Sequence, residues 1–228
     1  MNAHAFTFAG HDLQALACGA LFWPEQELLC VSDLHLGKSG RIARRAGLLV
    51  PPYETLDTLA RLDAALAETR ARTVVCLGDS FDDLAAAGGL SEEESLWIAR
   101  LQAGRRWIWI EGNHDPGPVD VGGQHRESLS LGGIVFRHIA DETASGEISG
   151  HYHPKARIAL RGRSLARPCF LVSAQRIILP AFGTYTGGLD CRDAAFAPLL
   201  KPPVFAVLTG TRATPFKLKQ PTKTTPLR

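Results

Sequence analysis

Short apolar runs that are typical of buried strands recur along this chain, and in its first half helical segments separate them. The first three runs are Leu28–Val31, Thr73–Leu77 and Trp107–Ile110. Between the first two, residues 53–70 carry leucines at helical spacing with charges between them, which predicts an amphipathic helix packed on a sheet. This alternation of strands and helices favours an α/β fold.

A second helix is indicated between the second and third runs. Ser91 and Glu94 have the spacing of a capping box, in which each side chain bonds the backbone amide of the other residue. The helix is expected to run to about Ala103, because Gly104 follows and glycine commonly ends helices. The acidic residues 92–94 are therefore interpreted as partners of the helix dipole rather than as metal ligands.

The second half of the chain is mostly strand-like. We see no linker within residues 1–210, so we expect one α/β domain of two packed sheets with outer helices. From Thr211 onward Thr, Pro and Lys dominate, and residues 211–228 are expected to form a basic, flexible tail. The later apolar runs are Ile134–Phe136, Glu147–Ser149, Cys169–Ser173, Arg176–Pro180 and Val204–Leu208.

Composition excludes several classes of protein. The formal net charge of +2 does not by itself mark a nucleic-acid binder. The five cysteines form no C-x-x-C pair, and buried free thiols in a reducing cytosol explain them better than disulfides or a zinc site. The N-terminus lacks a basic signal-peptide start, and no run of about 18 apolar residues exists. We therefore expect a cytoplasmic protein that does not span a membrane.

Residue types that bind divalent metals follow five of the apolar runs. Singly, each has an ordinary explanation: Asp79 could cap a helix, His138 could be a buried core histidine, and Asn113 could form a turn. The ordered set is harder to explain in that way. It indicates a metal site, because hard and borderline divalent metals take such oxygen and nitrogen ligands together. The five groups are Asp33/His35, Asp79, Asn113/His114, His138 and His151/His153.

The order of these motifs resembles the calcineurin-like metallophosphoesterases. Asp-x-His, Gly-Asp, Gly-Asn-His-Asp, a lone His and Gly-His-x-His occur in that order over Val31–Pro154. The resemblance implies a four-layer α/β/β/α sandwich of two mixed sheets with a two-metal centre where the strands end. At the matching positions it implies one metal held by Asp33, His35, Asp79 and His153, and another held by Asp79, Asn113, His138 and His151.

One position in this ligand set departs from the family pattern. The family's lone His is usually followed by Gly, whereas Ile139 follows His138 here. His125 is the alternative, since it lies in the same interval on a glycine-flanked loop. We favour His138 because it ends a strand, as the other ligands do.

The resemblance also implies a mechanism. Two divalent cations about 3.5–4 Å apart would lower the pKa of a shared water and hold the phosphoryl oxygens. His114 matches the family residue that faces the scissile phosphate without binding a metal and assists the leaving group. Such a histidine needs a carboxylate to fix its tautomer and raise its pKa. Asp82 is the first candidate, because other family members place an acid there, and Asp115 is the alternative.

The sequence around the first motif resembles that of a bacterial subfamily, the ligase-associated DNA damage response endonucleases. Ser-Asp-Leu-His-Leu-Gly-Lys begins at Ser32, and Pro-Pro-Tyr-Glu-Thr-Leu begins at Pro51. The resemblance implies a manganese-dependent DNA endonuclease in DNA repair that works with a DNA ligase and a helicase. Zn²⁺ or Fe²⁺ would suit the same two-metal site.

Basic residues near the motifs are candidates for substrate contact. Lys38 and Arg41 follow the first motif and are candidate phosphate contacts, and His125 is a further substrate-binding candidate. The arginines after the last motif either bind a polyanion or are ordinary solvated positions. They are Arg157, Arg161, Arg163 and Arg167.

Two other functions remain compatible with the sequence. The first is a small-molecule phosphodiesterase or nucleotide hydrolase with the same metal centre. The second is a metal-free scaffold that binds proteins, although the chain retains the complete ligand set.

Overall fold

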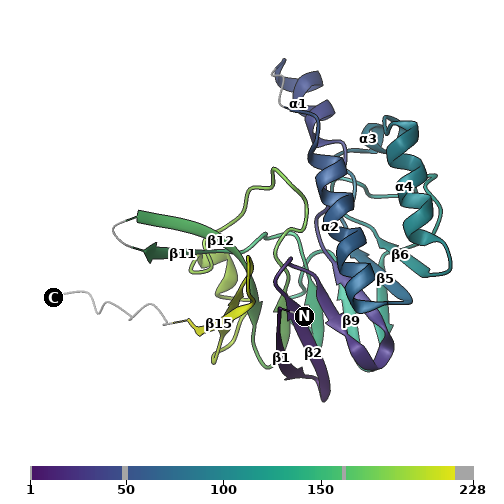
Figure 1. Cartoon of the computed structure of the whole chain (residues 1–228). Coiled ribbons are helices and arrows are strands. Elements are labelled where there is room, and N and C mark those ends of the chain that lie inside the picture. The colour runs from purple at the N-terminus through teal and green to yellow at the C-terminus, as the bar shows by residue number, and fades with distance from the viewer. Residues whose placement is uncertain (1, 48–50, 161–162, 219–228) are drawn as a thin grey trace.

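Two mixed β-sheets pack face to face, and the α-helices cover the outer face of the first sheet (Figure 1). The computed structural model describes residues 2–47, 51–160 and 163–218. In the first sheet the strands lie in sequence order, and neighbours from β4 to β7 are parallel. They are β1 (Ala3–Phe8), β2 (His11–Leu16), β3 (Leu21–Trp23), β4 (Leu28–Val31), β5 (Thr73–Leu77), β6 (Arg106–Ile110) and β7 (Gln124–Arg126).

The second sheet follows the order β15-β14-β12-β13-β10-β9-β8, with β11 paired to the outer part of β12. In its centre β10 is parallel to both β9 and β13. The strands are β8 (Ser128–Leu131), β9 (Ile134–Arg137), β10 (Glu147–Ser149), β11 (Lys155–Leu160), β12 (Arg163–Val172), β13 (Arg176–Ile178), β14 (Phe205–Leu208) and β15 (Thr214–Lys217).

The two helices expected from the sequence are present. Leu59, Leu62 and Leu66 on one face of α2 are buried against the first sheet. Ser91 and Glu94 form the predicted capping box at the start of α4. The helices are α1 (Lys38–Ala46), α2 (Glu54–Thr69), α3 (Leu84–Gly88) and α4 (Glu92–Gln102), with 3-10 turns η1 (Pro24–Gln26) and η2 (Ala194–Phe196).

Continuous apolar runs form the central strands of the first sheet because both faces of that sheet are buried. In β4, Leu29 and Val31 face the helices, whereas Leu28 and Cys30 face the second sheet. The fold class is confirmed as a sandwich of two mixed sheets. In the described part of the chain, the layer outside the second sheet consists of loops and η2, which contributes the buried Phe196.

A buried ion pair joins two strands of the second sheet. Arg176 on β13 is 1% exposed, and its Nε donates to Glu147 Oε1 on β10 at 2.9 Å. Its other nitrogens donate to the backbone carbonyls of Leu199 and Asp141. Because each charged group has a partner, the pair ties β10, β13 and two loops into one unit.

The second sheet extends further toward the C-terminus than the sequence indicated. Within the segment expected as a flexible tail from residue 211, β15 pairs antiparallel with β14, and Phe216 packs on the core outside this sheet. An edge strand is held mainly by backbone hydrogen bonds, which hydropathy does not reveal. Residues 219–228 lie outside the described part. Among the described helices, none has the length and apolar character needed to cross a bilayer.

Candidate metal centre

The metal-type residues lie in turns directly after β4, β5, β6, β9 and β10, and these strand ends meet at one edge of the sandwich. Several of the turns hold an L-residue in the left-handed region, which costs about 1–3 kcal/mol each. Such strain is typical of functional sites. The residues and φ values are Asp33 (53°), His35 (46°), Asp79 (46°), His151 (70°) and His153 (47°).

The first group of donor atoms comes from Asp33, His35 and His153, within 4.8 Å of one another. His153 Nε2 lies 3.1 Å from Asp33 Oδ1. His35 Nδ1 faces Asp82 Oδ1 at 2.9 Å, which leaves Nε2 as the free nitrogen of that ring. His35 Nε2 is buried without a hydrogen-bond partner, and His153 Nε2 has the Asp33 carboxylate beside it. Buried imidazole nitrogens beside a carboxylate are the donor set that a divalent cation requires.

The second group comes from Asp79, His138 and His151, again within 4.8 Å. His138 Nδ1 lies 2.8 Å from the Leu77 carbonyl oxygen and must donate to it, so in the neutral ring Nε2 carries the lone pair. That Nε2 lies 3.2 Å from His151 Nδ1 and 3.4 Å from Asp79 Oδ2. Bonds of about 2.1 Å to one cation separate its ligands by roughly 3.0–3.4 Å. The spacing therefore fits a metal ion.

Asn113 completes this second group. Its Oδ1 lies 2.9 Å from His138 Nε2. The Asn113 oxygen and the His138 nitrogen thus face one another, an arrangement that is favourable with a proton or a metal ion between them. The donors implied by the family pattern therefore fit divalent ions in both groups.

Electrostatics of the second group agree with this interpretation. Burial raises the pKa of Asp79, but hydrogen bonding and charge from His138 outweigh it and lower the pKa to about 2. Burial lowers the pKa of His138, yet Asp79 and Asp33 reverse this and raise it. A proton on His138 therefore neutralises the carboxylates, and a metal ion would take the place of that proton.

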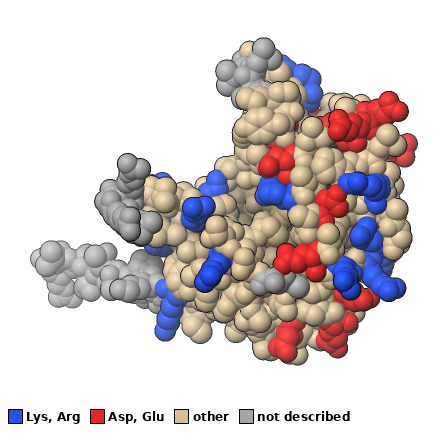
Figure 2. Space-filling model, in the orientation of Figure 1, with Lys and Arg blue, Asp and Glu red and all other residues tan. Residues whose placement is uncertain are grey.

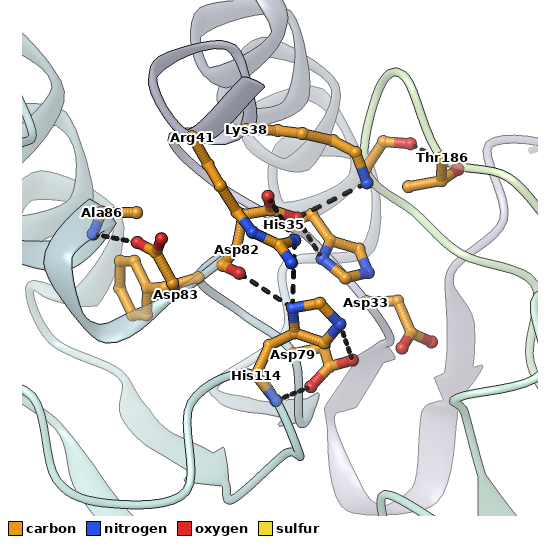
Figure 3. A network of polar contacts seen from close by, with 12 residues as sticks. Asp33, His35, Lys38, Arg41, Asp79, Asp82, Asp83, Ala86, His114 and Thr186 are labelled. Atoms are coloured by element: carbon orange, nitrogen blue, oxygen red, sulfur yellow. Dashed lines mark hydrogen bonds and ion pairs between the residues drawn. The ribbon is translucent and has the colours of Figure 1, made fainter. Parts of the chain in front are cut away.

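Asp82 and His114 are neighbours, but not in the expected way (Figure 3). His114 Nδ1 lies 2.8 Å from the backbone carbonyl oxygen of Asp82. The Asp82 carboxylate instead contacts His35 Nδ1 at 2.9 Å and Arg41 Nη1 at 2.9 Å. The expected carboxylate partner of His114 is thus corrected to a carbonyl, and the Asp82 carboxylate orients a proposed metal ligand.

The Asp115 carboxylate accepts hydrogen bonds from backbone amides rather than from His114 or His35. Its Oδ1 accepts from the backbone amides of Asp79 and Gly112 at 2.9 and 3.0 Å. Its Oδ2 accepts from Ser80 and Phe81 at 2.8 and 3.1 Å. Both oxygens are occupied in this way, so the alternative assignment as the carboxylate of His114 is also corrected. Asp115 fastens the turn after β5 to the turn after β6.

Two glycines allow these turns to approach each other closely. A Cβ at Gly112 would lie 2.1 Å from the Asp79 amide nitrogen. A Cβ at Gly78 would lie 2.6 Å from the His138 ring, and the φ of Gly78 is +72°. Any side chain at either position would displace a proposed ligand.

The three substrate-binding candidates occupy different places. Lys38 and Arg41, on the first turns of α1, both reach the Asp82 carboxylate at the rim of the centre. His125 lies on β7 opposite Trp109, with ring centroids 6.5 Å apart. It belongs to none of the donor groups among the described residues. The geometry therefore favours His138 as the lone histidine ligand, and it gives His125 no contact with the centre.

One supporting residue was missed by the sequence analysis. The Ser32 hydroxyl donates to Asp33 Oδ2, and both residues are buried. The adjacent position in Ser-Asp-Leu-His was the available signal, but neighbouring residues in a strand point to opposite faces and argued against contact. The turn after β4 removes that alternation.

A groove of about 380 Å³ leads away from the second group. It begins at Asn113 and His138. The carboxylates of Glu111 and Glu127 and the exposed side chain of Ile139 line it. Its other lining residues are Gly112, Pro116, Ser128 and Arg137.

Comparisons with known proteins agree with this geometry. The family model described as calcineurin-like phosphoesterase matches residues 27–161, a span that includes every proposed ligand. The crystal structure of Pseudomonas putida nuclease MPE is similar, with 30% sequence identity and a TM-score of 0.73. The similarity covers 94% of this chain and 100% of that one. No curated protein matches the chain.

Proposed function

Because this chain belongs to the calcineurin-like phosphoesterase family and is a metal-dependent phosphoesterase, we propose that it is a manganese-dependent endonuclease acting on DNA. The observation that carries the proposal is two groups of donor atoms at one edge of the sandwich, one from Asp33, His35 and His153 and the other from Asp79, His138 and His151. Similarity to a nuclease over almost the whole chain supports a nucleic acid as the substrate.

The metals would be held as the family pattern implies. Two divalent cations bound there would polarise the phosphoryl oxygens and lower the pKa of a nearby water. Mixed carboxylate, amide and imidazole ligands suit Mn²⁺, with Zn²⁺ and Fe²⁺ as alternatives. We assign Asp33, His35, Asp79 and His153 to one ion, and Asp79, Asn113, His138 and His151 to the other.

His114 is placed to assist the leaving group. Its backbone amide donates to Asp79 Oδ1 at 2.8 Å, and its Nδ1 is directed to the Asp82 carbonyl. Nε2 therefore faces the centre, 4.0 Å from Asp79 Oδ2. A proton on Nε2 would be donated to the departing oxygen, an effect worth about 10²–10⁴-fold in rate.

Lys38 and Arg41 would attract the phosphate backbone. Both contact the single carboxylate of Asp82, at 3.4 and 2.9 Å, so two cations face one anion and a positive charge remains. Arg44 on the same helix is instead paired with Asp83. In Figure 2 other basic side chains are spread over this face, several of them beside acidic ones, and Arg157 is paired with Asp190. The α1 cations are thus the best-placed contacts, and binding should weaken with salt.

The cellular setting proposed for this activity follows the subfamily resemblance. We propose DNA repair in the cytoplasm, with a DNA ligase and a helicase as partners. The five cysteines are free thiols, which is compatible with a reducing compartment.

A circular substrate tests the proposal directly, since it has no ends. Metal-stripped protein is reloaded with Mn²⁺, Zn²⁺ or Fe²⁺ and given circular single-stranded DNA, plasmid and an aryl phosphodiester. We expect Mn²⁺ to support cleavage of circular DNA, and Asp79→Asn to abolish it together with metal binding. Cleavage of the aryl ester with intact DNA, in every metal and at low salt, would refute the nuclease assignment.

His114→Ala tests the leaving-group role separately. We expect both metals to remain bound while turnover falls by about 10²–10⁴-fold, most strongly for esters with poor leaving groups. Metal content and rates on two aryl esters of different leaving-group pKa measure this. Full occupancy with undiminished turnover would contradict the role.

A small-molecule phosphodiesterase is the second candidate function. The groove beside His138 has a volume near the lower end of the range for small-molecule sites, and Glu111 and Glu127 in it would repel a polyanion. This candidate predicts rates that do not rise with oligonucleotide length and cleavage of single nucleotides at least as fast as of DNA.

A further inference from the structure

Two tyrosines at the rim of the metal centre expose their rings to solvent. Tyr53 is 52% exposed and Tyr185 is 37% exposed. Their ring centroids lie 5.6 Å apart with an interplanar angle of 57°. The two residues are far apart in sequence, and their contact does not bury either ring. An exposed pair of aromatic side chains is an unusual feature that commonly marks a binding surface.

Tyr53 is held beside the first ligand segment. It immediately precedes α2, whose first turn is bonded to the start of α1. Gly37 N donates to Thr55 Oγ1 at 3.0 Å, and Ser39 N donates to Glu54 Oε1 at 2.8 Å. These bonds hold the start of α2, and with it Tyr53, next to the segment that carries Lys38.

Tyr185 is held beside the same ligands from the other side. The loop 183–188 begins with Gly183 N donating to the Asp33 carbonyl at 3.0 Å. It ends at Gly188, where a Cβ would lie 2.0 Å from the His153 carbonyl oxygen. Figure 3 shows Thr186, the next residue, on the same side of the centre as Lys38. The loop that carries Tyr185 therefore rests on two ligand segments.

The backbone presents Tyr185 in a costly conformation. Its φ is 62°, in the left-handed region that glycine adopts without strain. Neighbouring bonds hold the loop, with Thr184 N donating to Thr58 Oγ1 at 3.1 Å and Arg61 donating to the Thr184 hydroxyl at 2.9 Å. The Tyr185 hydroxyl donates to the Pro51 carbonyl oxygen at 3.4 Å, and the residue stays 37% exposed beside Tyr53. A ligand that stacks on the ring would explain the strained backbone.

We propose that Tyr53 and Tyr185 form a stacking platform for an unpaired nucleobase next to the bond that is cut. An aromatic face stacks on any base, whereas bases in a duplex are already stacked and paired. Lys38 lies at one side of the loop, and Lys155 Nζ donates to the Thr186 carbonyl at 2.8 Å. These cations would neutralise the phosphates that flank the stacked base. The inference rests on the proposed function and names two residues that would contact its substrate.

The experiment measures KM and Kd for a short single-stranded oligonucleotide. Tyr53→Ala and Tyr185→Ala are compared with Tyr53→Phe and Tyr185→Phe, which keep the ring. Leu96→Ala, at a 63% exposed position on α4, is the matched surface control. We expect each alanine variant to weaken binding about 5- to 150-fold, with kcat little changed and duplex binding unaffected.

Two further readouts separate stacking from a structural role. An abasic nucleotide replaces each position in turn, and at one position its effect should vanish in the alanine variants, because both changes remove the same contact. A 2-aminopurine at that position should lose fluorescence on binding the wild type and the phenylalanine variants, but not the alanine variants. Thermal unfolding and metal content confirm that each variant is folded and loaded.

The outcomes distinguish the platform from the proposed function. If the wild type cuts single-stranded DNA but the alanine variants keep its KM within twofold, the platform is overturned and the nuclease stands. Additive effects of the abasic site and the alanine substitutions at every position would likewise overturn it. If the wild type neither binds nor cuts DNA in any metal, both proposals fail.

Discussion

Asp115 offers the sharpest test of how the centre is held together. Its two carboxylate oxygens accept four backbone amides, from Asp79, Ser80, Phe81 and Gly112. In Asp115→Ala these buried donors lose their acceptor, and each unsatisfied group costs about 1–3 kcal/mol. Water entry and relaxation reduce the sum, so we expect about 4 kcal/mol of lost stability, near the lower limit for four groups.

The isosteric variant Asp115→Asn isolates the hydrogen bonds from the volume change. Its amide nitrogen replaces one oxygen, so two of the four amides meet a donor instead of an acceptor. We expect Asp115→Asn to lower the free energy of unfolding by about 2 kcal/mol. For a chain of this size that lowers the Tm by about 4–8 °C, and Asp115→Ala should lower it by roughly twice as much. Asp120→Asn, at an exposed position in the same loop, is the matched control.

Calorimetry of the metal-free variants measures this effect without contributions from bound ions. Metal titration then follows the second consequence. Oδ1 of Asp115 joins the Asp79 turn to the turn that carries Asn113, so its loss should also weaken metal binding. If metal-free Asp115→Asn melts within 1 °C of Asp120→Asn, the four bonds do not hold the turns and the reasoning is wrong.

Three further predictions concern other parts of the molecule. Gly78→Ala should abolish binding of one metal by titration, because its Cβ would lie 2.6 Å from the His138 ring; full stoichiometry would contradict this. In chelated protein, the lowering of the pKa of Asp79 from 3.8 to about 2 contributes stability above pH 4 that is lost as the pH falls toward 2, about 2 kcal/mol in all. Acid denaturation of Asp79→Asn should lack this component, and an unchanged acid slope would refute it. Arg176→Met leaves the buried Glu147 without its closest partner and should cost about 3–5 kcal/mol in urea unfolding, whereas a neutral result would show that the pair is dispensable.

The sequence predicted the positions of the proposed ligands well, because each lies within a few residues of a recognisable strand. The run Leu28–Val31 is apolar at every position since both faces of β4 are buried, and that pattern shows where the strand ends. The ligands follow at once, so local pattern and topology were enough. The capping box at Ser91 was equally local and equally visible.

Contacts that depend on backbone direction could not be predicted in the same way. Which group of Asp82 faces His114 depends on the turn after β5, and residue types do not specify whether a carbonyl or a carboxylate points inward. The strand β15 was missed for a related reason. It contains Pro215 and Lys217 and is held by pairing with β14, so its composition resembles that of a tail.

The left-handed backbone of the ligand turns has a consequence for how this protein can change over generations. Asp33, His35, Asp79, His151 and His153 each occupy a conformation that glycine or asparagine adopts more easily. Substitutions that remove a ligand can therefore relieve strain, so loss of catalysis and gain of stability can coincide. Selection for the proposed metal ions would oppose that drift, and an inactive descendant of this chain would be expected to keep the sandwich while replacing these residues first.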